Sequence, residues 1–264
     1  MTVNKAFIRT TATVACLGLA TSVSSAVTLP TNVISVSASA GGQSGTVDID
    51  ISNAIVVGDA LQWVATSDIS ILDGGDVVAT IQKDTSIIMG FLPTAPTGDA
   101  SIRMTFFVQA NTVADTVFSI SSGALTNLAY TNADALATGG ITVTDSNNNG
   151  AEVRALNAGG TRFANFGYNA GLTFADLIDG SVVGDADVGN ITTVAGGSLA
   201  DAENSAAPGV FLPIGPVTEM EINYSFELTA GDQASGTAFF IVFPTPASAA
   251  LLGLGGLVAV RRRR

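Results

Sequence analysis

The chain contains no histidine and a single cysteine, Cys16, close to its N-terminus. The lack of histidine excludes Ser-His-Asp triads, imidazole zinc sites and the side chain that ordinarily titrates near neutral pH. If the first 26 residues are removed, no thiol remains, which excludes disulfides, thiolate metal sites and cysteine nucleophiles. The enzymatic options that survive are carboxylate-based, such as glycoside hydrolysis, or use Tyr or a Ser-Lys pair, and Lys83 is then the only lysine.

Charged residues are also scarce, and they are unevenly placed. They make up 12% of the chain, against a usual share of roughly 25%. Six of the ten basic residues lie in the two end segments, so the middle keeps four basic residues against all 22 acidic ones, and 4 − 22 = −18. Such a region has too few cations to neutralise phosphates, which argues against a nucleic-acid partner.

The N-terminal 26 residues have the layout of a secretory signal peptide. Lys5 and Arg9 form a positive start, residues 10–23 are uncharged and mostly small or apolar, and small residues precede a cleavage site after Ala26. An uncleaved membrane anchor is the alternative, but the apolar stretch is shorter than the roughly 20 residues a span needs. Acylation at Cys16 is a further alternative, although Thr13 stands where a lipoprotein signal has a large aliphatic residue.

The middle region, residues 27–243, is dense in alternation of apolar and polar residues. Residues 45–52, 101–109 and 218–228 alternate most regularly, and a period of two with one polar face predicts half-buried antiparallel strands. Further strands are expected at 33–38, 61–66, 77–82, 116–121, 141–144 and 161–168.

These strands predict an all-β fold, an antiparallel β-sandwich or jelly-roll-like domain. A short helix is expected at 171–180 and a loop at 195–209, and a terminal hairpin is expected to join residues 218–228 to 237–243. One domain covering 27–243 is the main interpretation. Two small sandwiches that meet near 130–140 are the alternative.

Residues 145–150, "DSNNNG", match the first six positions of a calcium loop, with oxygen ligands offered by Asp145, Asn147 and Asn149. The match ends there, because Leu156 occupies the position of the bidentate glutamate. A hairpin turn is the simpler interpretation, since Asn and Gly suit positive φ angles. Calcium is therefore kept as an option rather than predicted as a cofactor. A second acidic turn contains Asp185 and Asp187.

Glu219 and Glu221 lie on one face of a predicted strand, about 7 Å apart. That spacing suits the carboxylate pair of a glycoside hydrolase, but any solvent-facing strand has the same pattern. Asp48 and Asp50 have the same two readings. Trp63 and Tyr168 are options for lining a sugar site, although core or rim positions explain them more simply. We therefore predict no catalytic residue.

The C-terminal segment, residues 244–264, combines two prolines, an apolar stretch and a basic end. Residues 247–260 are apolar or small, and as a single hydrophobic helix they would be about 21 Å long, against a hydrocarbon core of about 30 Å. By the positive-inside rule the arginines at the end would stay in the cytoplasm, with the middle region outside. A buried terminal element of the domain is the alternative.

This layout resembles the bacterial PEP-CTERM sorting domain. Pro244 and Pro246 match its two prolines, while Thr245 replaces the glutamate of the family. The stretch 247–260 matches its membrane segment, and its basic tail is matched by Arg261, Arg262, Arg263 and Arg264. The resemblance implies a precursor held transiently in the cytoplasmic membrane and cut near the prolines by exosortase, a transpeptidase-like membrane enzyme. It also implies a Gram-negative-type envelope and export linked to exopolysaccharide.

A GlyGly-type tail, cut by rhombosortase, is the competing interpretation. Its glycine pair precedes the apolar stretch, whereas Gly255 and Gly256 lie inside it. We therefore expect a membrane-anchored precursor in the cell envelope and a mature structural protein of the cell surface or extracellular matrix. A carbohydrate- or calcium-dependent adhesion module is the alternative, and a carboxylate-dependent glycoside hydrolase is the lower one.

Overall fold

The computed structural model describes residues 27–91, 98–180 and 189–245. Within these ranges the chain forms seventeen strands, every strand pairing is antiparallel, and the one helical element is a single 3-10 turn, η1 (Ile51–Asn53). The all-β prediction is therefore confirmed. The strands are β1 (Asn32–Ala40), β2 (Gln43–Asp50), β3 (Ile55–Val57), β4 (Ala60–Val64), β5 (Ile69–Asp73), β6 (Asp76–Ile81), β7 (Ser86–Phe91), β8 (Ala100–Ala110), β9 (Thr116–Ser122), β10 (Leu125–Thr144), β11 (Glu152–Ala155), β12 (Ala164–Tyr168), β13 (Leu172–Leu177), β14 (Asn190–Thr192), β15 (Ser198–Asn204), β16 (Leu212–Leu228) and β17 (Gln233–Pro244).

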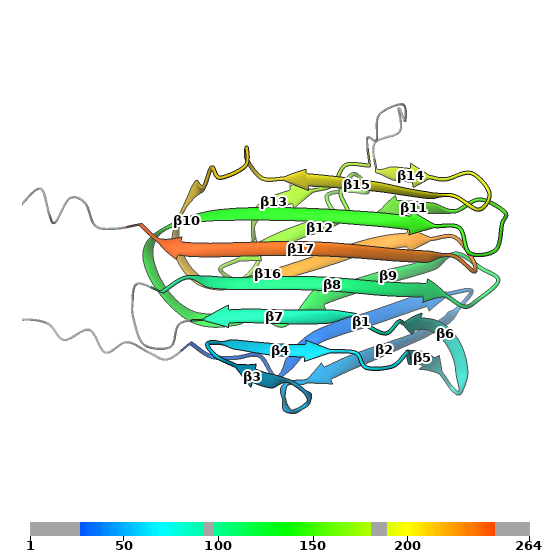
Figure 1. Ribbon diagram of the computed structural model, residues 1–264, viewed down its shortest axis with the longest axis horizontal. Coiled ribbons are helices and arrows are strands. Elements are labelled where there is room, and N and C mark those ends of the chain that lie inside the picture. Colours follow the sequence, from blue (N-terminus) through cyan, green and yellow to red (C-terminus); the bar gives the residue numbers. More distant parts are fainter. Residues whose placement is uncertain (1–26, 92–97, 181–188, 246–264) are drawn as a thin grey trace, which may run out of the picture.

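The strands belong to one sheet that curls so that its two halves face each other (Figure 1). In the front half the hydrogen-bonded order is β15, β10, β17, β8, β7, β4 and β3. In the back half it is β13, β12, β16, β9, β1 and β2, with β11 also paired to β16. The front half and the back half, so defined, enclose the core.

Strand β10 connects the two halves because it is long enough to serve both. Its first part pairs with β16, through Leu125 opposite Met220, and its second part pairs with β17, through Thr144 opposite Gln233. The strand runs through residues 130–140 as a single element. The alternative of two small sandwiches requires a boundary near 130–140, and this boundary would fall inside a continuous strand.

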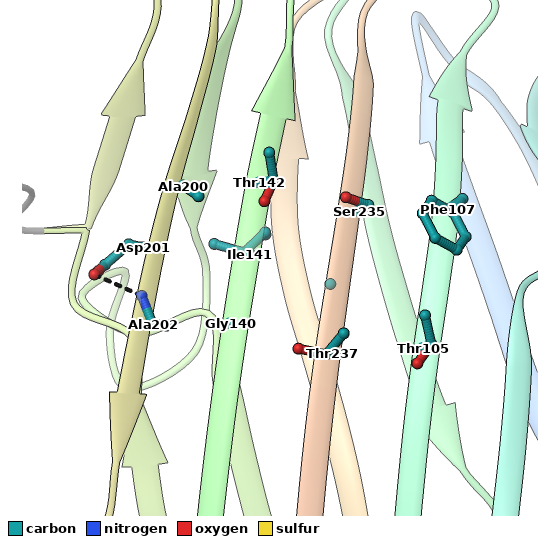
Figure 2. A pocket seen from close by; sticks show the side chains of 11 residues that line it. Thr105, Phe107, Gly140, Ile141, Thr142, Ala200, Asp201, Ala202, Ser235 and Thr237 are labelled. Carbon is teal, nitrogen blue, oxygen red and sulfur yellow. Dashed lines mark hydrogen bonds between the residues drawn. The ribbon is translucent and has the colours of Figure 1, made fainter.

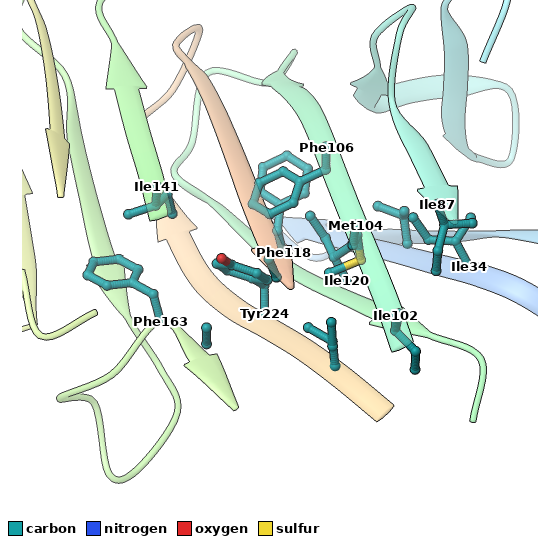
Figure 3. Packing of buried hydrophobic residues seen from close by; sticks show 14 of the residues in the cluster. Ile34, Ile87, Ile102, Met104, Phe106, Phe118, Ile120, Ile141, Phe163 and Tyr224 are labelled. Atoms are coloured by element: carbon teal, nitrogen blue, oxygen red, sulfur yellow. The ribbon is translucent and has the colours of Figure 1, made fainter. Parts of the chain in front are cut away.

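Alternating side chains from both halves meet in an aromatic core (Figure 3). The Phe106 ring on β8 packs edge-on against Tyr224 on β16, with ring centroids 4.8 Å apart, and stacks at 5.8 Å on Phe226. Phe240 on β17 meets Phe166 on β12 at 5.7 Å. Such pairs add to the burial of apolar area, so the contacts hold the front half against the back half.

Most predicted strands are present, with shifted ends. The regular alternation at 218–228 corresponds to buried Met220, Ile222, Tyr224, Phe226 and Leu228 with half-exposed neighbours between them. The stretches 33–38, 61–66, 77–82, 116–121 and 161–168 fall on β1, β4, β6, β9 and β12. The sequence predicted these strands because one face of each strand is covered, which imposes an alternation of apolar and polar residues.

Two local predictions were wrong. The short helix expected at 171–180 is strand β13, which pairs with β12 in the back half. The loop expected at 195–209 contains β15, which pairs with β10 through all seven of its residues. Both strands lie at edges of the sheet, where pairing with a neighbouring strand outweighs a weak local preference.

The predicted terminal hairpin was also wrong. β16 pairs with β9, β10, β11 and β12, whereas β17 pairs with β8 and β10, so the two consecutive strands lie in opposite halves. The turn at 229–232 carries the chain across the edge of the core, and the Thr229 hydroxyl bonds the Asp232 carboxylate there. Two strands of a hairpin and two strands facing across a core show the same alternation, so the sequence pattern does not distinguish them.

No helix in the described ranges has the length and apolar character required to cross a membrane. The segments that carry the predicted signal peptide and the predicted membrane helix, 1–26 and 247–260, lie outside these ranges.

Candidate functional site

The outward surface of the front half carries two adjoining depressions, the first of which is drawn in Figure 2. The first, of about 230 Å³, is lined chiefly by Thr105, Phe107, Gly140, Thr142, Ser235 and Thr237. The second, of about 410 Å³, is lined by Arg103, Thr105, Thr138, Thr237, Ala238 and Phe239. The two share Thr105 and Thr237, so together they form one shallow groove across β10, β17 and β8, here named the outer-face groove.

Gly140 lines the first depression, and its lack of a side chain helps to keep this part of the groove open. A Cβ atom on Gly140 would lie 3.4 Å from the Ala202 Cβ and 3.5 Å from the Thr237 Oγ1, so a side chain would occupy the space between these neighbours. On either side, Thr142 and Thr138 point outward from the same strand, since alternate residues share a face. The groove therefore offers hydroxyl groups around a small apolar floor.

The floor is supported from inside by Tyr224. Its hydroxyl donates to the Thr237 carbonyl at 2.7 Å and approaches the Gly140 carbonyl at 3.2 Å, which links β16 in the back half to β17 and β10 in the front half. Burial raises the pKa of Tyr224 well above its ordinary value. The phenol therefore stays protonated and acts as a permanent donor beneath the groove.

The calcium candidates Asp145, Asn147 and Asn149 are brought into one turn after β10. Asp145 Oδ1 accepts the backbone N–H groups of Asn147 and Asn148 at 3.1 and 2.8 Å. Its Oδ2 accepts those of Gly150 and Gly196 at 3.0 and 2.6 Å. Burial alone would raise the pKa of Asp145, but these four donors outweigh it and lower the pKa to about 2.

Both polar atoms of the Asn147 side-chain amide form hydrogen bonds. Its amide donates to the Ala230 carbonyl at 2.8 Å, and its carbonyl oxygen accepts the Asn149 backbone N–H. Two of the three proposed ligands thus already bind protein donors or acceptors. No group of three acidic side chains able to hold a metal ion occurs among the described residues.

The positive φ angles of Asn148 and Gly150, 64° and 91°, agree with the turn interpretation. The turn does not close a hairpin, because β10 and β11 are not paired with each other: β11 pairs with β14 and β16. Asp232, which the sequence analysis did not single out, lies beside this turn and accepts the Ser146 N–H at 3.1 Å. Burial, with a contribution from the Asp145 charge, raises the pKa of Asp232.

The candidate carboxylate pair, Glu219 and Glu221, lies half-exposed on the outward side of β16 in the back half. Glu221 covers Gly167 of β12, where an added Cβ would lie 2.9 Å from Glu221 Oε1. Neither glutamate lines either of the two depressions. Of the other pair, Asp50 accepts the Ser52 N–H at 2.7 Å and caps η1, which lowers its pKa, and Asp48 is exposed.

The two aromatic residues considered for a sugar site lie in different halves of the sheet. Trp63 on β4 is only 8% exposed and belongs to the core. Tyr168 on β12 is partly buried and packs against that core from the back half. The aromatic residues of the outer-face groove are Phe107 and Phe239 instead, and neither was a candidate from the sequence.

The sorting motif is described only at its start. Pro244 ends β17 opposite Ala133, and the Thr245 N–H donates to the Asn132 carbonyl at 3.1 Å. At the other end of the described chain, Thr28 pairs with Thr126. Pro246, Arg261 to Arg264, the cleavage residue Ala26, and Asp185 and Asp187 lie outside the described residues.

No protein-family model matches the chain, and no curated protein is significantly similar to it. Among solved structures, one of the infectious bursal disease virus Gx strain is 11% identical over 84% of this chain and 54% of its own, with a TM-score of 0.30. A mutant VP2 protein of the same virus in T=1 particles is 9% identical, over 83% and 59%, with a TM-score of 0.23. The membrane-inserted NetB toxin of Clostridium perfringens is 9% identical, over 70% and 79%, at 0.12. The chain spans little more than half the length of the viral chains, and likenesses this distant assign no function.

Proposed function

We propose that the chain is an exported, non-catalytic structural protein of the cell surface or extracellular matrix, with a β-sandwich or jelly-roll-like domain. The observation that supports this most directly is the placement of the two ends of the described chain. Thr28 and Thr245 both attach to the first part of β10, at Thr126 and Asn132, and both ends leave the same end of the molecule (Figure 1). A domain with this geometry can stand on a membrane from one end, with its broad faces clear of the surface.

The sequence at both ends supplies the rest of the proposal. A signal peptide cut after Ala26 starts export, and residues 247–260 with the four terminal arginines hold the precursor in the cytoplasmic membrane. An exosortase-type enzyme then acts near Pro244–Pro246, where the last strand ends. In this scheme, the mature domain is released to the cell surface or matrix, where exopolysaccharide is the expected partner.

Cell fractionation with mass spectrometry of both protein termini tests this proposal. The mature protein is expected in the envelope or outside the cell, beginning at Val27 and ending near Pro244–Pro246. Replacing Arg261 to Arg264 by glutamine is expected to remove the retained precursor, while the same change at Arg162, inside the domain, leaves processing intact. Full-length protein found in the cytoplasm with residues 1–26 still attached would refute the proposal.

A binding module is the second candidate function, and the outer-face groove is the observation that favours it. Its lining combines hydroxyl groups, small residues and the rings of Phe107 and Phe239, which is a surface suited to a hydroxyl-rich ligand. Titration calorimetry with a glycan panel, in calcium and in chelator, tests it. Binding that needs calcium would point to the turn of Asp145, whereas binding without calcium would point to the groove.

A further inference from the structure

The basic residues of the described chain are few enough to compare one by one. The Arg154 guanidinium donates to Glu152 at 2.6 Å and to Glu227 at 3.1 Å, and Arg162 lies 4.0 Å from Asp179. Lys83 is exposed in the turn before β7. Among the described residues, Arg103 differs from the other two arginines in having no carboxylate within ion-pairing distance, and it differs from Lys83 in lying on a broad sheet face.

Arg103 is held in place by an aromatic ring rather than by an acid. Its guanidinium carbon lies 5.4 Å from the centroid of Phe239, which is its direct neighbour across the β8–β17 pairing. On its other side Ile88 of β7 is the paired residue. An arginine stacked on a ring keeps its five N–H donors free, so this guanidinium is positioned to bind an external anion.

The outer-face groove runs from this arginine towards a second ring. Phe107 lies on β8 four residues beyond Arg103, which is roughly 13 Å along the strand. Between the two positions, Thr105 and Thr237 face each other as a cross-strand pair and are shared by both depressions. The groove therefore has an apolar ring near each end and hydroxyl groups in the middle.

Of the described residues that line the two depressions, Arg103 and Asp201 are charged, and Arg103 alone presents its charge to the groove. Asp201 of β15 borders the first depression, but its side chain points away from the groove: its carboxylate accepts the N–H of Ala202, as drawn in Figure 2, and the N–H of Gly180. Three strand spacings, roughly 14 Å, separate β15 from β8. A negative group of a ligand in the groove is therefore favoured at the Arg103 side.

From this arrangement we propose that the outer-face groove binds a sparsely acidic saccharide chain, with a carboxylate paired to Arg103 and sugar rings packed on Phe239 and Phe107. The hydroxyl groups of Thr105 and Thr237 each donate and accept, which matches the hydroxyl groups of a sugar. A guanidinium pairs with a carboxylate through two parallel hydrogen bonds. One arginine neutralises one negative charge, so in a region of net charge −18 a polymer with an acid on every unit is repelled.

This inference deepens the binding-module candidate and rests on it, but it does not depend on export. The test uses the full-length protein in a polyoxyethylene detergent and titration calorimetry. The probes are a glucuronate–N-acetylglucosamine hexasaccharide, which has one carboxylate on every second sugar, its carboxyl-reduced neutral form, and sodium acetate. A failed export experiment would leave this assay unaffected, so the two proposals fail separately.

The acidic hexasaccharide is expected to bind more tightly than its neutral form, and acetate alone is expected to bind far more weakly than either. Arg103→Gln is expected to weaken binding of the acidic form about tenfold, which is the range of a charge-assisted hydrogen bond, and to abolish the difference between the two forms. Phe239→Leu is expected to weaken both forms. Arg162→Gln, which removes the same group away from the groove, is expected to match the wild type.

Four results would overturn the proposal: equal affinity for the acidic and neutral forms, equal effects of Arg103→Gln and Arg162→Gln, acetate binding as tightly as the hexasaccharide, or no binding heat at all. The first comparison needs only the wild-type protein, so it stands even if a variant folds poorly. Arg103→Lys provides the conservative check, because it keeps the charge and loses the paired hydrogen bonds.

Discussion

At the scale of single residues, two glycines on neighbouring strands of the front half have opposite roles. Gly236 on β17 faces the core, where an added Cβ would lie 2.3 Å from the Phe106 ring. Gly140 on β10 faces outward, where the nearest atom to an added Cβ would be 3.4 Å away. The first glycine makes room for the packing between the halves, and the second makes room for the groove.

Replacing each of these glycines by alanine separates the two roles. Gly236→Ala is expected to lower the free energy of unfolding by about 1–3 kcal/mol, since the Phe106 ring must move in a packed core. Gly140→Ala is expected to change it by less than about 1 kcal/mol, because the methyl group makes ordinary contacts. Urea unfolding of both variants measures this. Equal losses would contradict the assignment of inner and outer faces.

Asp145 is a second residue whose role depends on what surrounds it. Its carboxylate gathers four backbone N–H groups from the turn at 145–150 and from Gly196, so it ties two loops together at one end of the sheet. Because its pKa is lowered from 3.8 to about 2, it contributes stability above pH 3.8, and this contribution is lost as the pH falls towards 2. Asp232 has a raised pKa, so its effect has the opposite sign and favours the folded state at low pH.

Asp145→Asn is expected to lower the melting temperature most at about pH 6 and progressively less as the pH falls from about 4 to about 2. The amide group places N–H donors against those of Gly150 and Gly196, so the loss at neutral pH includes two broken hydrogen bonds. Melting curves across this pH range measure the difference from wild type, with Asp48→Asn, an exposed aspartate of β2, as the control. A difference that does not shrink at low pH would show that the charge of Asp145 is not what stabilises the turn.

At the scale of elements, the sequence pattern did not determine which strands pair with each other. The sequence pattern predicted both β16 and β17, and for β16 it also predicted the inward residues correctly. It also suggested that they pair with each other, whereas each pairs with strands far away in the chain, such as β9 and β8. Contacts of this kind depend on which faces cover each other, and a period of two carries no such information.

Engineered disulfides test this pairing in a Cys16→Ser background. Thr105→Cys with Thr237→Cys is expected to form a disulfide, because these residues are direct partners in the β8–β17 pairing. Ser225→Cys with Ser235→Cys is expected to remain reduced, although a hairpin with a short turn at 229–231 would place them opposite each other. Mass spectrometry of peptides digested without reductant identifies the bonds. An intramolecular bond between positions 225 and 235 would contradict the topology.

At the scale of the whole molecule, the main features are the net negative charge and the position of the two ends of the described chain. The region between the two end segments has a net charge of −18, from four basic and 22 acidic residues, so like charges repel across the folded surface. Both ends of the described chain attach to the first part of β10, which leaves the opposite end of the sheet, with the turns at 145–150 and 229–232, remote from them (Figure 1). The net negative charge and the shared position of the two ends bear on the surroundings in which the protein acts, rather than on a reaction that it could catalyse.

Salt is expected to raise the melting temperature, because it screens this repulsion over distances of about 8–10 Å at moderate ionic strength. Calcium chloride and sodium chloride at the same ionic strength are expected to give similar increases, since both carboxylate oxygens of Asp145 already accept backbone N–H groups. Melting curves in the two salts make the comparison. A markedly larger increase in calcium would reveal a calcium site and favour the calcium-dependent adhesion alternative.

The sequence by itself determined the all-β class, most strand positions and which side chains of those strands face inward, because burial of one face imposes a period of two on the residues. It also determined the acidic character of the middle region and the signals proposed for its two ends. It did not reveal β13 or β15, because β15 consists mostly of small and acidic residues and β13 buries only Leu177 fully, so neither segment has a strong period-two pattern.

Only the tertiary structure decided which strands pair and where a site forms. Arg103, Gly140 and Phe239 come from three strands that are distant in the chain, and they form one groove only because β10, β17 and β8 lie side by side. The same is true of Asp145 and Asp232, which are brought together because the end of β10 pairs with the start of β17, with Thr144 opposite Gln233. The identity of a side chain determines which groups it can bind. The register between strands that are distant in the chain determines which other side chains lie beside it, and no local sequence pattern encodes that register.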